Sequence, residues 1–311
     1  MSNTSELETT SLCANCGKGE EDGIKLKACT ACKLVKYCNR ECQIAHRPQH
    51  KKDCKKRVKE LHEEKLFKQP PSEDDCPICF LRMPSLDPTG KKYKACCGKR
   101  ICSGCFFAPI YDDQGNKADN NKQNQCHFCR TPHPKTEEEL NEMRKKRMEK
   151  DDPLAIYIQG SHYRDGTCGY PQNYTKALEL YRRAAELGHA GAYSSIGYAY
   201  NTGKGVEIDK KKALYFYEQA AVKGDTSARH NLGINEAKAG NIDRALKHHM
   251  IAIKGGFTHS LEAIKRLYSK GHATKDDYMK ALHLYQKYLV EIKSTQRDKA
   301  AAFDGDQYRY Y

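Results

Sequence analysis

The sequence contains no tryptophan, and it has no long hydrophobic run. Only 38% of its 311 residues are hydrophobic, and the mean hydropathy is −0.87. No stretch approaches the roughly 18 consecutive apolar residues of a membrane-spanning helix. Residues 1–10, MSNTSELETT, lack the apolar core of a secretory signal. We therefore expect several small modules rather than one large core, no membrane association, and a cytoplasmic or nuclear location.

Cysteine, in contrast, is abundant and clustered. Fifteen of the 16 cysteines lie between Cys13 and Cys129, and only Cys168 lies outside this region. In a reducing compartment, dense cysteines indicate metal binding rather than disulfide bonds.

The formal net charge of +14 treats every cysteine as neutral. Fifteen thiolates on four zinc ions would reduce this charge to about +7. Basic runs such as KKDCKKR (51–57) and RKKR (144–147) are more often solvated helix faces than nucleic-acid sites. We therefore expect protein partners and consider nucleic acid unlikely.

The first cysteine module, residues 13–54, offers eight ligands, which is the number that two tetrahedral zinc ions need. The ligands are Cys13, Cys16, Cys29, Cys32, Cys38, Cys42, His50 and Cys54. His46 is an alternative, but the spacing of His50 and Cys54 favours His50, because residues four apart share one helix face. So short a segment cannot bury a sufficient core, so metal must supply its folding energy.

The stretch YCNRECQIAHRPQHKKDC (37–54) resembles a MYND finger. The resemblance implies a module that binds short proline-containing peptides, although Arg47 stands where the family usually has tryptophan. It also implies two interleaved zinc sites. The first is formed by Cys13, Cys16, Cys38 and Cys42, and the second by Cys29, Cys32, His50 and Cys54.

The second cysteine module spans residues 76–132. CPIC (76–79) and CHFC (126–129) form its end pairs, and KACCGKRICSGC (94–105) lies between them. This order of cysteines resembles a variant RING finger. In this alignment Cys97, Cys102 and Cys105 fall on ligand positions, whereas the usual histidine position falls near Lys99. A protonated lysine is a poor zinc ligand.

Counting ligands assigns the missing place to Cys96, with His127 as the alternative. The predicted third zinc is held by Cys76, Cys79, Cys102 and Cys105, and the fourth by Cys96, Cys97, Cys126 and Cys129. No carboxylate lies within the cysteine pairs, so we expect structural rather than catalytic zinc. The RING resemblance also implies that Ile78 and Arg130 contact a ubiquitin-conjugating enzyme, with no covalent catalytic residue in this chain.

The C-terminal half contains four related helical segments, anchored by alanines at steps of 36, 32 and 36 residues. The anchors are Ala177, Ala213, Ala245 and Ala281. A helix-hairpin repeat has this length. Each anchor follows a predicted N-cap by four residues, and these caps are Asn173, Asp209, Asn241 and Asp277. Gly188, Gly224 and Gly256 are predicted to end the helices.

The best copy resembles the Sel-one-like repeat. The matching residues are Gly197, Tyr200, Gly203, Gly205, Val206, Asp209, Lys212, Ala213, Tyr217, Ala220, Ala221 and Gly224. Later copies diverge, because His249 replaces tyrosine and Ile292 replaces glycine. Stacked helix pairs of this kind present a concave face that binds peptides or proteins.

The predicted fold is a set of small zinc-stabilised modules followed by an all-α helical-hairpin repeat solenoid. The expected parts are a disordered leader (1–12), the first module (13–54), a charged helix and linker (55–75), the second module (76–132), a charged linker helix (133–152), the repeats (153–292) and a polar tail (293–311). The predicted function is a zinc-binding protein-interaction scaffold. The alternative is a RING-type ubiquitin ligase whose repeats select the substrate.

Overall fold

The computed structural model describes residues 12–19, 23–70, 75–85, 89–108 and 125–310. The chain divides into two compact units, Met1–Lys68 and Gln69–Tyr311. Within the described ranges, no helix is both long and apolar enough to cross a membrane.

The first unit contains a short hairpin and one long helix. β1 (Lys27–Ala28) pairs antiparallel with β2 (Lys36–Tyr37), and α1 (Arg40–Phe67) follows. The side chain of Asn39 caps α1 by accepting a hydrogen bond from the Cys42 N–H at 2.8 Å. The charged helix expected from residue 55 is therefore the C-terminal part of a helix that begins inside the first cysteine module.

The second cysteine module opens the second unit with a hairpin and one short helix. β3 (Lys91–Lys94) pairs antiparallel with β4 (Lys99–Cys102), and α2 (Ser103–Phe107) continues from β4. Its core is small, with Met83 and Ile101 buried among three cysteines. Such a core agrees with a module that needs metal to fold.

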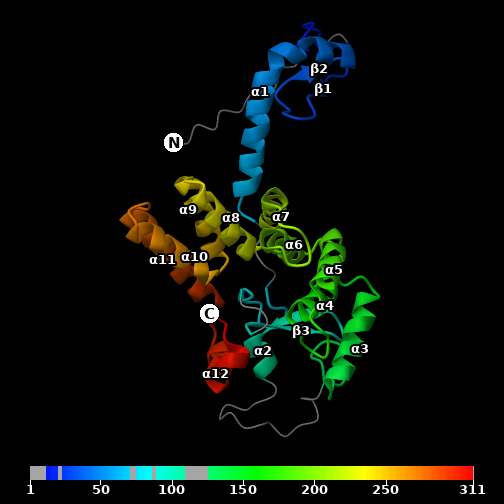
Figure 1. The fold of residues 1–311 in the computed structure, drawn as a ribbon, viewed down its shortest axis with the longest axis vertical. Coiled ribbons are helices and arrows are strands. Elements are labelled where there is room, and N and C mark those ends of the chain that lie inside the picture. Colours follow the sequence, from blue (N-terminus) through cyan, green and yellow to red (C-terminus); the bar gives the residue numbers. More distant parts are fainter. Residues whose placement is uncertain (1–11, 20–22, 71–74, 86–88, 109–124, 311) are drawn as a thin grey trace. The chain divides into compact units, whose positions relative to one another are not determined.

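Helices form the rest of the second unit (Figure 1). They are α3 (Glu137–Met148), α4 (Pro153–Asp165), α5 (Tyr174–Glu186), α6 (Ala190–Thr202), α7 (Lys210–Val222), α8 (Thr226–Lys238), α9 (Ile242–Lys254), α10 (Thr258–Ser269), α11 (Lys275–Ile292), α12 (Thr295–Phe303) and α13 (Gly305–Tyr308). Helices α4 to α11 pack in successive hairpins, α4 with α5, α6 with α7, α8 with α9 and α10 with α11. The predicted fold class, cysteine modules followed by a helical-hairpin repeat, is confirmed.

A glycine on the first helix of a pair lets a ring of the second helix approach closely. A Cβ added to Gly197 would lie 2.7 Å from the Tyr217 ring, and one added to Gly160 would lie 2.8 Å from the Tyr181 ring. In the third pair, a Cβ on Gly233 would lie 2.6 Å from the ring of His249. His249 therefore occupies the buried place that tyrosine holds in the earlier pairs.

Most helix ends follow the predicted signals, although Asn241 stands at the N-cap of α9 without a side-chain capping hydrogen bond. Asn173 and Asp209 accept hydrogen bonds from backbone N–H groups of the first turns of α5 and α7. Asp277, predicted as an N-cap, instead lies inside α11. The N-cap there is Thr274, which forms a reciprocal capping box with Asp277. The predicted stop at Gly188 has a left-handed backbone, with φ of 92°.

Residues 293–311, predicted from their composition as a polar tail, are helical over much of their length. Residues 295–303 form α12, which packs against α2, so the C-terminus returns to the second cysteine module (Figure 1). Ala300 and Tyr308 are buried in one cluster with Phe107. The C-terminal segment therefore has a small buried apolar face, although most of its residues are polar.

The second cysteine module contacts both ends of the helical array. At the α3–α4 end, the Tyr93 hydroxyl donates to Asp152 at 2.8 Å, and Arg147 pairs with the same carboxylate at 2.8 Å. Burial alone would raise the pKa of Asp152, but these two partners lower it below its ordinary value. At the α9–α11 end, Arg82 pairs with Glu291, and the Ser85 N–H donates to the Tyr288 hydroxyl at 2.7 Å.

The buried His249 makes the stability of the repeats depend on pH. Burial, with smaller effects of His230 and Arg266, lowers its pKa from 6.5 to about 3. Between these two pH values the unfolded chain binds more protons at this site than the folded chain. The free energy of unfolding should therefore fall as the pH decreases below 6.5, by at most ~1.4 kcal/mol per pH unit for this group.

We expect His249→Tyr, which restores the residue of the other pairs, to make this decrease shallower. Urea unfolding at several pH values between about 7.5 and 5 measures the slope. The exposed His283→Tyr is the control and should keep the wild-type slope. Parallel slopes for wild type and His249→Tyr would contradict the assignment.

Candidate metal centres and interaction surfaces

The first cysteine module brings its eight predicted ligands into two groups. Cys13, Cys16, Cys38 and Cys42 form one group, and Cys29, Cys32, His50 and Cys54 form the other; within each group the ligand atoms lie within 4.8 Å of one another. The Sγ atoms of Cys16 and Cys38 are 3.6 Å apart, and those of Cys29 and Cys54 are 3.9 Å apart. These are the same interleaved groupings that the MYND resemblance implied.

Two histidines lie near the second of these groups, and they have different partners. The Nε2 atom of His50 is 3.1 Å from the Sγ atom of Cys32, so it faces the cysteines. His46 instead lies with its Nδ1 atom 3.1 Å from the Tyr37 hydroxyl and stacks on the His50 ring. This arrangement places His50, and not His46, in the second donor group, and His46 packs against the His50 ring.

The second cysteine module also forms two groups. Cys76, Cys79, Cys102 and Cys105 make one, and Cys96, Cys97, Cys126 and Cys129 make the other. The Sγ atoms of Cys79 and Cys102 are 3.8 Å apart, and those of Cys97 and Cys126 are 3.7 Å apart. Cys96 belongs to the second group, whereas His127 does not.

All four groups fit zinc. A Zn–S distance of about 2.3 Å in a tetrahedron places two sulfurs about 3.8 Å apart. The separations above lie close to this value. Each group supplies four donors and contains no carboxylate. Four protein donors complete a tetrahedral shell and leave no position for a reacting water, so such sites stabilise structure.

The sequence did not predict the turn that follows four of the five pairs of cysteines spaced three residues apart. The residues after Cys16, Cys32, Cys79 and Cys129 all have a left-handed backbone; they are Gly17, Lys33, Phe80 and Arg130. Each of them donates its N–H to the carbonyl of the first cysteine of its pair, at 2.8 to 2.9 Å. This tight turn aims both sulfurs at one point, and three of the four turns use a residue other than glycine.

Ile78 and Arg130, the predicted enzyme contacts, lie on these turns. The Ile78 side chain lies between Cys76 and Cys79 and is 38% exposed. Arg130 follows Cys129 and is also exposed. Phe80 is exposed as well, so the turn after Cys76 presents apolar side chains to solvent.

Arg297 of α12 reaches the third cysteine group from the far end of the chain. Its side chain is fully buried. It donates to the carbonyl oxygens of Arg82 at 2.9 Å and Ile292 at 2.5 Å, and its Nη2 atom lies 3.7 Å from the Sγ atom of Cys79. Zinc with four thiolates carries a net charge of −2, and a buried guanidinium beside it offsets part of that charge.

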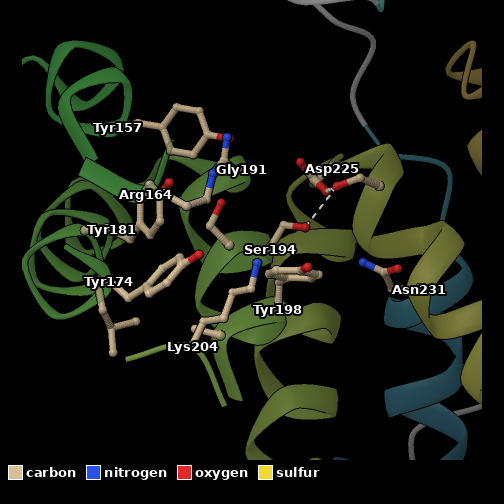
Figure 2. Close-up of a pocket in the computed structure, with 15 residues that line it drawn as sticks. Tyr157, Arg164, Tyr174, Tyr181, Gly191, Ser194, Tyr198, Lys204, Asp225 and Asn231 are labelled. Atoms are coloured by element: carbon tan, nitrogen blue, oxygen red, sulfur yellow. Dashed lines mark hydrogen bonds between the residues drawn. The ribbon is translucent and has the colours of Figure 1, made fainter. Parts of the chain in front are cut away.

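A pocket of about 210 Å³ opens on the helical repeats, lined by residues of α4, α5, α6 and α8. In Figure 2, Lys204 lies between Tyr174 and Tyr198. Its Nζ atom is 5.2 Å from one ring centroid and 5.5 Å from the other. At the other side of the pocket Asp225 accepts a hydrogen bond from Ser227 at 2.7 Å. Aromatic rings beside amide, hydroxyl and charged groups suit the recognition of a peptide.

The fold and the cysteine groups together define a protein of cysteine-rich modules with candidate metal sites, followed by helical-hairpin repeats. Its residues 13–54 match the MYND finger, and residues 149–189, 190–225 and 263–287 match the Sel1 repeat. The chain therefore contains a MYND finger and Sel1 repeats, both of which are protein-interaction modules. The segment with Gly233 and His249 lies outside these repeat matches, in agreement with its divergence.

Known proteins resemble parts of the chain. The E3 ubiquitin-protein ligase DA2 of Arabidopsis thaliana is 37% identical over 87 residues, which cover 26% of this chain and 19% of DA2. The E3 ubiquitin-protein ligase GW2 of Oryza sativa subsp. indica is 39% identical over 59 residues, which cover 19% of this chain and 11% of GW2. The chain thus spans less than a fifth of the length of these relatives. A Sel1 repeat protein from Oxalobacter formigenes is 31% identical, with a TM-score of 0.43, covering 48% of this chain and 63% of that chain.

Proposed function

We propose that this chain is a zinc-dependent scaffold that gathers partner proteins, with its finger and its repeats binding separate partners. The observation that carries the proposal is the pairing of a MYND finger with Sel1 repeats in two distinct compact units. The four donor groups have structural ligand sets, and the pocket of Figure 2 has a lining suited to a peptide.

Substitution of Tyr198 tests whether the pocket on the repeats binds peptides. Tyr198 lines the pocket and is 43% exposed, so a bound peptide would pack on its ring. We expect Tyr198→Ser to weaken binding of peptides selected on the full chain by about tenfold or more, because tyrosines are frequent binding hot spots. Tyr215, which is 57% exposed and lies outside the pocket, provides the matched control as Tyr215→Ser. Equal affinities for the two variants would place the peptide elsewhere.

We further propose that the chain holds four zinc ions, two in each cysteine module. Native mass spectrometry should count four ions in wild type and three in Cys96→Ser. In that variant hydrogen exchange should rise at residues 126–129 and stay unchanged at residues 76–79, because the two groups share no ligand.

Cys168→Ser is the control for the zinc count. Cys168 lies outside the four groups, so this variant should keep four ions. Four ions in Cys96→Ser would show that His127 or another donor fills the place of Cys96.

A second candidate function is RING-type ubiquitin ligation, with the second cysteine module recruiting a conjugating enzyme. Two observations support it: the partial similarity to the DA2 and GW2 ligases, and the exposure of Ile78 and Arg130 on the turns of two cysteine pairs. In this function the chain would position the conjugating enzyme beside a bound substrate and would supply no nucleophile of its own.

Autoubiquitination with a panel of conjugating enzymes tests this candidate. We expect wild type to form chains with at least one enzyme, and Ile78→Ala and Arg130→Ala to reduce the rate by about tenfold or more, because each removes a central contact. Ile208→Ala and Arg182→Ala remove exposed residues of the same types from the repeats and should retain the rate. If no enzyme yields chains, the ligase function is excluded and the scaffold function stands.

A further inference from the structure

A larger cavity lies where the second cysteine module meets the first helices of the array. Its volume is about 730 Å³, compared with about 210 Å³ for the pocket of Figure 2. One wall comes from β3 and from residues 132–134, and the facing wall comes from α3 and α4. Tyr157 and Arg164 of α4 line both cavities. We call the larger cavity the junction groove.

Much of the lining of the junction groove is apolar. Leu140 and Met143 of α3 and Leu154 and Ile158 of α4 contribute aliphatic side chains, and Phe106 adds a ring. All five are only partly buried. Aliphatic walls favour an aliphatic or aromatic side chain over stacked nucleobases, which would need flat aromatic platforms.

The charged groups of the groove are nearly all cationic. Lys94 and Arg144 are each only 6% exposed, so their charges lie away from bulk solvent. Arg144 donates to the Asn141 Oδ1 atom, and among the described residues it forms no ion pair with a carboxylate. The lining contains one carboxylate, Asp165, and Arg164 pairs with it at 2.7 Å.

Lys94 has a different environment from Arg144. Its Nζ atom lies 3.3 Å from the Nε2 atom of His133 and 4.0 Å from the centroid of the Phe106 ring. The fourth cysteine group lies close enough that its sulfurs, as thiolates, favour the charge of Lys94. Arg144 is therefore a buried cation of this groove with which no carboxylate of the described residues forms an ion pair.

A buried cation without an anionic partner is costly, and an anion that reaches it gains a charge-assisted hydrogen bond in a partly dry site. We propose that the junction groove binds an anionic peptide segment of a partner protein, with a carboxylate or phosphate at Arg144 and an apolar side chain against α3 and α4. This proposal rests on the scaffold function and names the chemical class of one partner.

The zinc-loaded full chain is tested first against an oriented library of short peptides. Each position is fixed in turn as aspartate, glutamate, phosphoserine, leucine, glutamine or lysine. We expect selection of an acidic residue or phosphoserine close to an apolar residue. Preference for phosphoserine over glutamate identifies a phosphorylated partner, and the reverse identifies an acidic one.

Fluorescence anisotropy with the selected peptide then compares two matched variants. Arg144→Gln should weaken binding by about tenfold or more, because it removes a charged hydrogen bond. Lys145→Gln makes the same charge change one residue away, on an exposed position outside the groove, and should bind as wild type does. Arg144→Lys, which keeps the charge, should lose less affinity than Arg144→Gln, and binding should weaken with added salt.

Circular dichroism shows whether each variant is folded. If Arg144→Gln does not fold, Met143→Glu replaces it, because a carboxylate at the groove should repel the same peptide.

Three results would overturn the proposal: selection of neutral or basic peptides or of none, equal affinities for Arg144→Gln and Lys145→Gln, or displacement of the peptide by a polyuridine oligonucleotide. Peptides that lose affinity with Tyr198→Ser but not with Arg144→Gln would overturn the groove and leave the scaffold function intact.

Discussion

Buried charged groups tie the second cysteine module to both ends of the helical array, and the organisation of the second unit depends on these contacts. At one end Asp152 accepts from Tyr93 and Arg147 while it also caps α4. At the other end Arg297 enters the module with no exposed surface. Burying such groups is favourable only when each has well-placed partners, so the module and the repeats stabilise each other.

Arg297 links the docking of α12 to the third cysteine group. Its partners are two backbone carbonyls and a cysteine sulfur rather than a carboxylate. A thiolate bound to zinc attracts a guanidinium more strongly than a neutral thiol does. Metal in the third cysteine group would therefore strengthen the docking of α12, and α12 in turn would shield that group from solvent. Such reciprocity links the folding of a small metal module to the last helices of the chain.

The cysteine groups and the helical pairs were predictable from the sequence because both follow from local spacing. Four donors must close a tetrahedron, so Cys96 could be placed by counting. In a helix-hairpin repeat, alanine and glycine recur at fixed sequence intervals. Ala177 and Gly188 are the first such pair in this chain. The cap at Thr274 was missed because Asp277 alone kept register with the other copies.

The return of α12 to the second cysteine module could not be predicted in this way. Residues 293–311 read as polar, and a single arginine that becomes buried has no periodic signature. Its partner Arg82 lies 215 residues away in the sequence. Only tertiary packing joins them.

The placement of the groove bears on both proposed functions. Its walls come from the second cysteine module and from α3 and α4, and the Tyr93–Asp152 hydrogen bond holds the module against α4. A peptide in the groove would therefore be fixed relative to Ile78 and Arg130, which belong to the same compact unit. Positioning within one unit raises the effective concentration of one bound partner at another, whereas two independently moving sites do not provide this. A scaffold gains selectivity from this arrangement, and a ligase would gain a substrate held beside its conjugating enzyme.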